Sequence, residues 1–587
     1  MIFGKHINKY YLRFSWMLLL GVASLFAVDF FQLKIPELYG LIIDGLDPST
    51  PGTLGMDTVL SVCTEMLGII AIMVLGRFLW RIGFFGSAIR VETQMRDEMF
   101  DRCKDLSQQY YQVNKVGDLM SLFTNDLDTI NECFGDGMLL FFDALLLGGM
   151  SLYKMATLNL TLMLFSLVPL FFMGMVGTIV GKYMQKKWEE RQEAFSKLSD
   201  YAQETFSGIA VVKAFVSEFK ELLRFRKLNR HNEEVNVQFT RAAVLLEISV
   251  NLFVQSVICV ILGYGGWLVY SGQLSVAQLI MFLSYFDAVI WPVMAVSNLI
   301  EMTSRGKASL NRIGKLIDRK PDVADRDGVQ DPGPLHGEIE FRHLTFRYPD
   351  TDRAVLNDVS LHIRAGERIG VIGKTGCGKT TLVDLLLRIY NVPDGMLFLD
   401  GKDINTLPIH RVREDTAYVP QDNFLFSDTI GGNIAFSEGG QATPERIQRA
   451  AHIAALDDNL ADFSDGYDTV LGERGVTISG GQKQRTSIAR AVMKNAAILI
   501  LDDSVSAVDT GTEKKIIERL REDRTGKTTL LIAHRVSTVE QMDKVLLLDD
   551  GRVVDFGTHQ QLLERCEEYR TTVELQRLES EIGGMNA

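Results

Sequence analysis

The sequence predicts a multi-domain membrane protein, in which a six-helix transmembrane domain with long cytoplasmic helical extensions precedes an α/β domain. Its 587 residues exceed what one hydrophobic core usually supports. A hydrophobic content of 47% and a mean hydropathy of +0.09 are high for a soluble protein, whereas 23% charged residues are too many for a wholly embedded one. Long apolar segments fill the N-terminal half, and short apolar runs alternate with helical stretches in the C-terminal half.

Six apolar segments are long enough to cross a bilayer as helices, which takes about 20 residues. They are residues 14–43, 58–84, 135–155, 158–180, 244–270 and 276–302. The basic N-terminus with its apolar continuation also fits a secretion signal. We interpret it as the first span, because the apolar stretch continues further and similar segments follow.

The distribution of basic residues predicts the orientation. Lys5, Lys9 and Arg13 precede the first span, and many Lys and Arg residues lie between spans four and five, whereas the opposite connections hold only Lys154. We therefore expect both termini and the α/β domain in the cytoplasm, with the protein in the cytoplasmic membrane. The connections 85–134 and 181–243 are too long for structureless loops, so we expect them to continue the spans as helices.

Composition also limits the function. A net charge of −13 without a long basic block disfavours nucleic-acid binding. Six scattered cysteines without a CxxC pair argue against a zinc site or a disulfide framework. We expect a transmembrane domain at 1–318, a polar linker with three prolines at 319–337, and the α/β domain with a C-terminal helix at 338–587.

The strongest motif is GKTGCGKTT, which follows the strand-like RIGVI and precedes the helical TLVDLLLRIY. It meets the phosphate-loop pattern GxxxxGK[ST], in which backbone NH groups converge on phosphate oxygens. Lys379 reaches the outer phosphates, and Thr380 is a ligand for magnesium. The motif comprises Gly373, Lys374, Thr375, Gly376, Cys377, Gly378, Lys379, Thr380 and Thr381.

Two further patterns support nucleotide chemistry. The apolar run AILILDD delivers Asp502 to the magnesium side of a nucleotide, so the pair of motifs predicts binding of a nucleoside triphosphate with Mg²⁺. In TISGGQKQR, Ser479, Gly480 and Gly481 precede a helix. Such an arrangement binds anions, and by local chemistry alone it is equally an ordinary helix cap.

ISGGQ, from Ile478 to Gln482, resembles the signature motif of ATP-binding cassette (ABC) proteins. The resemblance implies ATP and Mg²⁺ as ligands and two copies of the architecture per pore. It also implies that Tyr348 stacks on adenine, that Gln421 lies near magnesium, and that His534 contacts the γ-phosphate. TVLGERG at 469–475 resembles a loop found in ABC exporters. Six spans before one such domain look like an exporter half-transporter.

The resemblance also assigns two coupling helices, which dock on nucleotide domains. They are NDLDTI, which begins with Asn125 and Asp126, and GIAVVKAF, which begins with Gly208 and Ile209.

Asp503 departs from the family pattern, which has glutamate after the magnesium aspartate to polarise the attacking water. Aspartate is shorter by roughly 1 to 1.5 Å, and misplacement of that size costs on the order of a hundredfold in rate. One interpretation is a slow but ordinary enzyme. The other, which we favour, is the degenerate-site subunit of a heterodimeric bacterial multidrug exporter, whose signature motif serves the partner's ATP.

Ionisable and aromatic residues inside the spans are candidates for the path of a small amphipathic, in part cationic, substrate. They are Arg77, Arg81, Asp143, Tyr285, Asp287 and Trp291. Structural ion pairs, snorkelling arginines and helix packing explain the same residues. The alternatives to a heterodimeric multidrug exporter are a homodimeric lipid or peptide exporter and an ATP-gated channel or regulatory subunit with little turnover.

Overall fold

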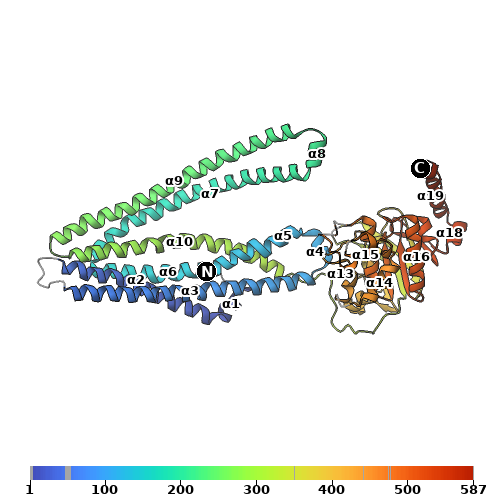
Figure 1. Cartoon of the computed structure of the whole chain (residues 1–587), viewed down its shortest axis with the longest axis horizontal. Coiled ribbons are helices and arrows are strands. Elements are labelled where there is room, and N and C mark those ends of the chain that lie inside the picture. The colour runs from blue at the N-terminus through green and yellow to red at the C-terminus, as the bar shows by residue number, and fades with distance from the viewer. Residues whose placement is uncertain are drawn as a thin grey trace. The chain divides into compact units, whose positions relative to one another are not determined.

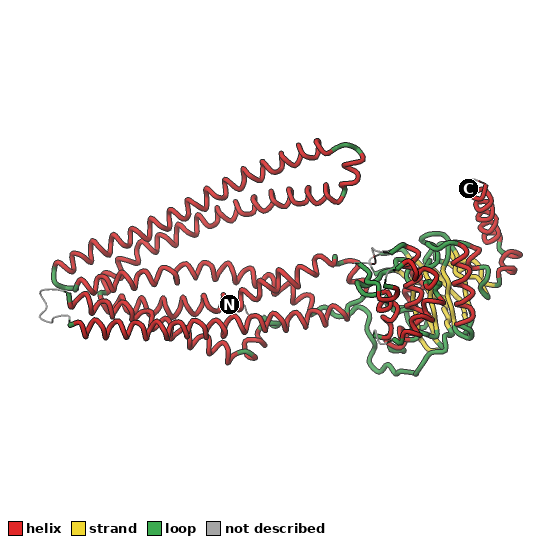
Figure 2. Tube along the Cα trace, in the orientation of Figure 1, coloured by secondary structure: helices red, strands yellow, loops and turns green. Residues whose placement is uncertain are grey.

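The computed structural model describes residues 4–46, 55–349, 351–439, 442–463, 465–472, 475 and 478–585. The chain divides into two compact units (Figure 1). The membrane unit comprises Met1–Arg102 and Gly117–Asp318, and the nucleotide unit comprises Cys103–Val116 and Arg319–Ala587. The first is all-helical, whereas the second contains all the described strands (Figure 2).

The membrane unit consists of long helices and short connecting helices. They are α1 (Asn8–Arg13), α2 (Ser15–Gly45), α3 (Met56–Asp105), α5 (Val116–Ser121), η1 (Leu122–Asp126), α6 (Leu127–Leu158), α7 (Leu160–Ser207), α8 (Ile209–Ala214), α9 (Glu218–Tyr270) and α10 (Val276–Ile317). At a rise of about 1.5 Å per residue, the 53 residues of α9 greatly exceed a hydrocarbon core of about 30 Å. The prediction that the spans continue as helices beyond the membrane is therefore confirmed.

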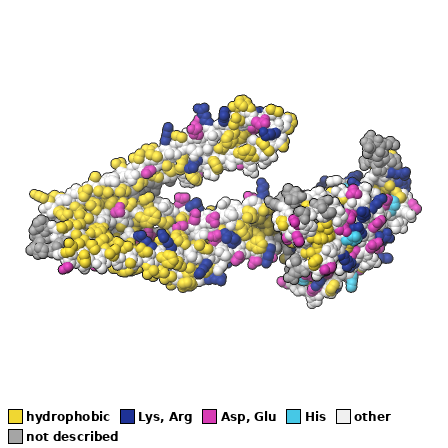
Figure 3. Space-filling view, viewed as in Figure 1, with side chains coloured by type: hydrophobic (Ala, Val, Ile, Leu, Met, Phe, Trp, Pro, Cys, Tyr) yellow, Lys and Arg dark blue, Asp and Glu magenta, His cyan; other side chains and the backbone are white. Residues whose placement is uncertain are grey.

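Packing within this unit follows the apolar faces. α6 lies along α10 and contacts α2. α7 packs against α9 along many residues of both helices. Figure 1 shows the α7–α9 pair separating from α6 and α10 toward α8, the short helix that joins them. The core between α10 and its neighbours includes Phe282, Tyr285 and Phe286. Large apolar side chains also cover the outer surface, as expected for a lipid-facing bundle (Figure 3).

The count of six spans is not confirmed. Among the described residues, five helical segments are long and apolar enough to cross a membrane: Ser15–Gly45, Met56–Asp105, Val116–Leu158, Glu218–Tyr270 and Val276–Ile317. The expected fourth span falls in α7, where the described residues form a shorter apolar segment, Leu160–Pro169. The fourth span, 158–180, therefore stays a prediction.

The two expected coupling helices differ in structure. Ile209–Ala214 is a separate short helix, as predicted. The prediction of a short helix at 125–130 is wrong, because η1 runs without a break into α6. Asp126 is buried there, and its carboxylate accepts hydrogen bonds from Ser309 Oγ at 2.6 Å and Arg312 Nε at 3.0 Å. This segment is thus fixed against α10.

The nucleotide unit holds two sheets. Its strands are β1 (Ile339–Arg347), β2 (Ala354–Ile363), β3 (Arg368–Ile372), β4 (Leu397–Leu399), β5 (Lys402–Asp403), β6 (Thr416–Val419), β7 (Ile498–Asp502), β8 (Thr528–Ile532), β9 (Lys544–Asp549) and β10 (Arg552–Gly557). An antiparallel sheet has the order β2-β1-β4-β5, and the second sheet has the order β10-β9-β3-β8-β7-β6. From β9 to β6 the second sheet is parallel, which confirms the predicted α/β domain.

Helices connect these strands and cover the sheets. They are α11 (Lys379–Leu386), η2 (Ile404–Thr406), α12 (Ile409–Glu414), α13 (Ile430–Ile434), η3 (Ala435–Glu438), α14 (Pro444–Ile453), η4 (Asp457–Asp462), η5 (Gly466–Asp468), α15 (Gly480–Met493), α16 (Thr510–Asp523), α17 (Val536–Val539), α18 (His559–Arg565) and α19 (Glu567–Met585). Ligands of parallel sheets bind at the carboxyl ends of the strands, which here lead into the predicted motifs.

Two segments outside the expected α/β domain belong to the nucleotide unit. The stretch expected as a linker is held by ion pairs from Arg326 to Asp394 at 2.6 Å and from Arg411 to Asp331 at 3.0 Å. Cys103–Val116 contains α4 (Gln108–Val113), whose Gln112 accepts a hydrogen bond from the Tyr390 hydroxyl at 2.6 Å. Sequence reasoning did not single out α4.

We expect Asp126→Ala to destabilise the membrane unit by about 1–3 kcal/mol, because the buried Ser309 hydroxyl and the Arg312 guanidinium lose their acceptor. The measurement is the thermal unfolding midpoint in lipid nanodiscs. Asp128→Ala, two residues away and exposed, is the control and should leave the midpoint unchanged. Equal midpoints for both variants would contradict a structural role for Asp126.

Candidate nucleotide-binding site

The phosphate loop lies between β3 and α11, and its shape depends on glycine. Gly376 and Gly378 have φ angles of +82° and +101°, in the left-handed region that other residues rarely adopt. A Cβ at Gly373 would collide with the carbonyl oxygen of Leu548 and lie 2.7 Å from Cys377 Sγ. The loop therefore closes tightly over the sheet, with α11 beginning at its end.

Lys379 and Thr380 open α11 beside this loop. Lys379 is buried, and its Nζ donates to the carbonyl oxygens of Gly373 at 2.7 Å and Lys374 at 2.9 Å. The ammonium group is thus held inside the curl of the loop, where phosphate oxygens would approach. Thr380 Oγ1 instead donates to Asp502 Oδ2 at 3.0 Å. Thr380 and Asp502, two of the three predicted magnesium ligands, therefore meet, although they lie 122 residues apart in the chain.

Asp502 ends β7, whose five residues are all buried. Burial raises the pKa of its carboxyl, and the nearby Asp503 charge acts in the same direction. The hydrogen bond from Thr380 and the charges of Lys379 and His534 oppose this rise. An added divalent cation would favour the ionised form, and the hydroxyl and carboxylate oxygens are the donors that Mg²⁺ prefers. The residues present fit the expected ion.

Asp384, in α11, is a further acid that sequence reasoning missed. Burial, aided by the charge of Asp502, raises the pKa of its carboxyl to about 6. A third acid near Asp502 and Asp503 increases the attraction of this edge for a cation. No local pattern marks it, because an acidic residue one turn into a helix usually faces solvent.

Asp503 follows Asp502 in a constrained backbone conformation. Its φ angle is +47°, and its NH group donates to the carbonyl oxygen of Ile532 at 3.0 Å. Its own carbonyl accepts from Ser506 Oγ at 2.9 Å and Gln484 Nε2 at 3.4 Å. The backbone position from which the Asp503 side chain extends is therefore fixed by three hydrogen bonds.

The other nucleotide residues expected from the resemblance surround the same edge. The Tyr348 hydroxyl is hydrogen-bonded to Thr381 Oγ1 at 2.9 Å, and its ring packs edge-on against Tyr390 with centroids 5.0 Å apart. Gln421 follows β6 and His534 follows β8, and both side chains are exposed. The strand order puts their strands beside β7.

The ISGGQ segment forms the start of α15. Ser479 is the N-cap, and it exchanges hydrogen bonds with Gln482: Gln482 N to Ser479 Oγ at 3.3 Å and Ser479 N to Gln482 Oε1 at 2.9 Å. A Cβ at Gly481 would lie 2.9 Å from the carbonyl oxygen of Ala507. The helix-cap interpretation thus describes the local structure, and the glycines leave backbone accessible beside it. Gln484, which we did not predict, links α15 to the Asp503 turn.

In the loop expected at 469–475, Glu473 and Arg474 lie outside the described residues.

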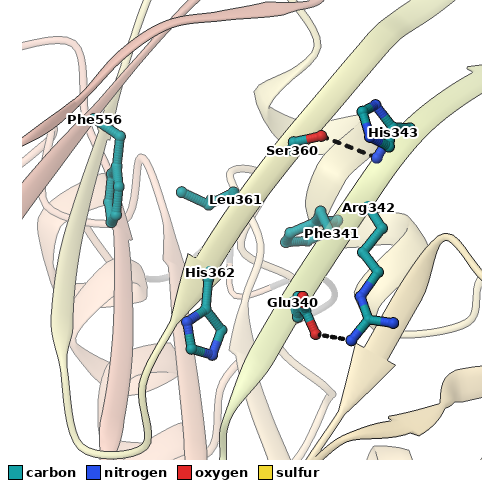
Figure 4. A pocket seen from close by; sticks show the side chains of 8 residues that line it. All are labelled: Glu340, Phe341, Arg342, His343, Ser360, Leu361, His362 and Phe556. Atoms are coloured by element: carbon teal, nitrogen blue, oxygen red, sulfur yellow. Dashed lines mark hydrogen bonds and ion pairs between the residues drawn. The ribbon is translucent and has the colours of Figure 1, made fainter.

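A separate hollow of about 510 Å³ lies on the antiparallel sheet (Figure 4). Its charged residues are mutually paired, as in the 2.6 Å contact between Arg342 and Glu340. It contains none of the predicted nucleotide residues.

This geometry defines a class: a phosphate-loop nucleotide domain joined to a helical membrane domain. Comparison with known proteins agrees. Residues 18–293 match the model of the ABC transporter transmembrane region, and residues 356–506 match that of the ABC transporter ATP-binding domain.

Similar proteins match over nearly the full length. A probable multidrug resistance ABC transporter ATP-binding/permease protein, YheI, of Bacillus subtilis is 35% identical and covers 100% of this chain and 99% of its own. The multidrug resistance-like ATP-binding protein MdlA of Escherichia coli is 32% identical, covering 98% and 97%. An ATP-dependent lipid A-core flippase of Syntrophus aciditrophicus is 33% identical, covering 84% and 82%.

A solved structure of a bacterial Atm1-family ABC exporter with ATP bound has a TM-score of 0.75 and 27% identity, and covers 97% of this chain and 98% of its own. The chain belongs to the ABC transporter family, as an exporter with its membrane and ATP-binding domains in one polypeptide. It is therefore an ATPase-coupled, multi-pass membrane transporter, of a family that functions as dimers in the lipid bilayer.

We expect Gly373→Ala to weaken ATP binding at least tenfold, because the new methyl group displaces the loop from the carbonyl of Leu548. The measurement is the dissociation constant of a fluorescent ATP analogue. Thr525→Ala, an exposed position after α16 and outside the loop, is the control and should bind as the wild type does. Unchanged affinity of Gly373→Ala would contradict the need for this close approach.

Proposed function

We propose that this chain is one half of a heterodimeric multidrug exporter, in which its own ATP site is slow and its signature motif serves the partner's site. The observation that carries the proposal is Asp503, a short acid in an otherwise complete site. The printed names of YheI and MdlA, which refer to multidrug resistance, support the substrate class.

The roles of the residues follow from their positions. The phosphate loop and Lys379 hold the triphosphate, Tyr348 stacks on adenine, and Thr380, Asp502 and Gln421 hold Mg²⁺. Bound Mg²⁺ supplies positive charge that stabilises the phosphoryl group during transfer. Asp503 accepts a hydrogen bond from the attacking water only at an increased distance, so hydrolysis there is slow.

Nucleotide binding reaches the membrane unit through the coupling helices. α8, with Gly208 as its N-cap, buries none of its residues and exposes Val211 and the following Phe215. Such an apolar end of a long helical pair is suited to dock on a nucleotide domain. For Asn125 and Asp126 we retain a coupling role of a different kind. The hydrogen bonds of Asp126 to Ser309 and Arg312 make this segment a rigid connection to α10.

Asp503→Glu restores the missing methylene, and we expect it to raise ATP turnover of the purified chain about tenfold to a hundredfold. Asp503→Asn is the matched control and should not exceed the wild type. The wild-type chain should turn over ATP slowly by itself and rapidly when mixed with its partner subunit. Rapid turnover by the wild-type chain alone would overturn the slow-site proposal.

The proposed substrate path includes a polar group between three helices. Trp291 Nε1, from α10, donates to Asp143 Oδ2, from α6, at 2.7 Å. Asp29, from α2, is 2% exposed, with Oδ2 lacking a partner among the described residues, and the charges of Asp143 and Arg77 act on it. Two carboxylates beside an indole ring suit an organic cation.

The remaining candidates for the substrate path fall into two groups, those with structural contacts and one that is retained. Tyr285 donates to Glu37 Oε1 at 3.3 Å, and Arg81 lies over the Trp80 ring at 5.4 Å, which are structural contacts. Asp287 is exposed on α10 and is retained as a candidate.

We expect Asp143→Asn to reduce transport of a cationic dye about tenfold and to leave a neutral dye unaffected, because only the cation loses an opposite charge. Transport into inverted vesicles measures both. Asp57→Asn, exposed in the first turn of α3, is the control. Equal loss for both dyes would assign Asp143 to packing.

A homodimeric lipid exporter is the second candidate, favoured by the similarity to a lipid A-core flippase. It requires brisk ATP turnover and lipid translocation by this chain alone. The same turnover measurement therefore separates the two candidates.

A further inference from the structure

The C-terminal helix α19 reaches the loop after β8 through one side chain. Gln576 Nε2 donates to the carbonyl oxygen of His534 at 2.7 Å, and Gln576 Oε1 accepts from the backbone NH of Val536 at 2.8 Å. One planar amide thus bonds to the two peptide groups that flank Arg535, across 40 to 42 residues of sequence.

The two hydrogen bonds of Gln576 lie at the start of α17, where no neighbouring side chain caps the helix. Val536 begins α17, and its NH is among those that a helix leaves without an internal partner. The N-cap Arg535 makes no side-chain cap hydrogen bond. Gln576 takes the place of that cap and at the same time binds the carbonyl of the preceding His534.

The packing of α19 explains why Gln576 lies there. Tyr569 is fully buried in a cluster that also contains Ala533 and Val536, and Val573 packs against that cluster. Tyr569, Val573 and Gln576 are spaced by four and three residues, so they lie on one face of the helix. The Tyr569 hydroxyl is also hydrogen-bonded to His559 Nδ1 at 2.8 Å.

The far side of α17 is held from α16. Glu513 is buried and accepts a hydrogen bond from Thr538 Oγ1, and its Oε2 lies 3.5 Å from Arg535 Nη1. α17 is therefore fixed on one side by Glu513 and on the other by Gln576. Of the two, Gln576 bonds directly to the peptide of His534.

We propose that Gln576 is a positioning residue for ATP hydrolysis: it fixes the backbone of His534, so that the exposed imidazole is presented to the γ-phosphate position. Through this contact the C-terminal helix acts on the nucleotide site. The inference rests on one part of the proposed function, the role of His534 at the γ-phosphate. It does not depend on slow hydrolysis at the Asp503 site.

The test compares Gln576→Leu, similar in size but unable to hydrogen-bond, with Glu574→Leu, an exposed position on the same helix. Full-length protein without a partner subunit is used in lipid nanodiscs, so that the measured turnover is that of the site that contains His534. Hydrogen exchange of the Val536 amide should accelerate about threefold to tenfold in Gln576→Leu only. The kcat for ATP should fall by a similar factor with little change in KM, because the phosphate loop is untouched.

A double variant separates positioning from general damage. In a His534→Ala background, Gln576→Leu should cause no further loss of kcat, because it acts through His534. Gln576→Glu, which retains the acceptor for Val536, should keep slow exchange at that amide while losing the donor to His534.

Three results would overturn the proposal. They are faster exchange with unchanged kcat, an additive loss in the double variant, and full turnover by His534→Ala. The last would remove the role of His534 itself and leave the slow-site proposal standing, since that proposal is judged by the turnover of the chain alone.

Discussion

The hydrogen bond between Thr380 and Asp502 is the contact on which the nucleotide site depends. It joins the first turn of α11 to the end of β7, two elements that the sequence separates by more than a hundred residues. Because β7 is fully buried, the carboxylate of Asp502 has little freedom to move. Lys379, which precedes Thr380, is thereby also held in place beside the loop.

Sequence reasoning succeeded where the chemistry is local. The phosphate loop is nine consecutive residues, and the strand before it and the helix after it could be predicted from the same stretch. Asp384 and Gln576 could not, because their significance comes from partners in other elements. The continuous helix at Asn125 and Asp126 was missed for the same reason, since Asp126 bonds to Ser309, 183 residues away.

For the membrane unit, prediction from the sequence was limited in a different way. Among the described residues, apolar length agrees with five of the six expected spans, because hydrocarbon contact has a simple compositional signal. It could not identify where each helix leaves the membrane, since α9 continues without a break from polar to apolar sequence. Nor could it show that α4 groups with the nucleotide unit, which depends on contacts such as that of Gln112 with Tyr390.

The backbone around Asp503 explains why a shorter acid is not easily compensated. Its NH group is bonded to Ile532 at the end of β8, and its carbonyl is bonded to Ser506 and Gln484. Moving the backbone toward the nucleotide would break these bonds and disturb the pairing of Asp502 with Ile532 in the parallel sheet. Each lost hydrogen bond costs about 1 kcal/mol. The backbone therefore holds the Asp503 side chain at a fixed starting point, and a change in the length of the acid changes the reach of its carboxylate.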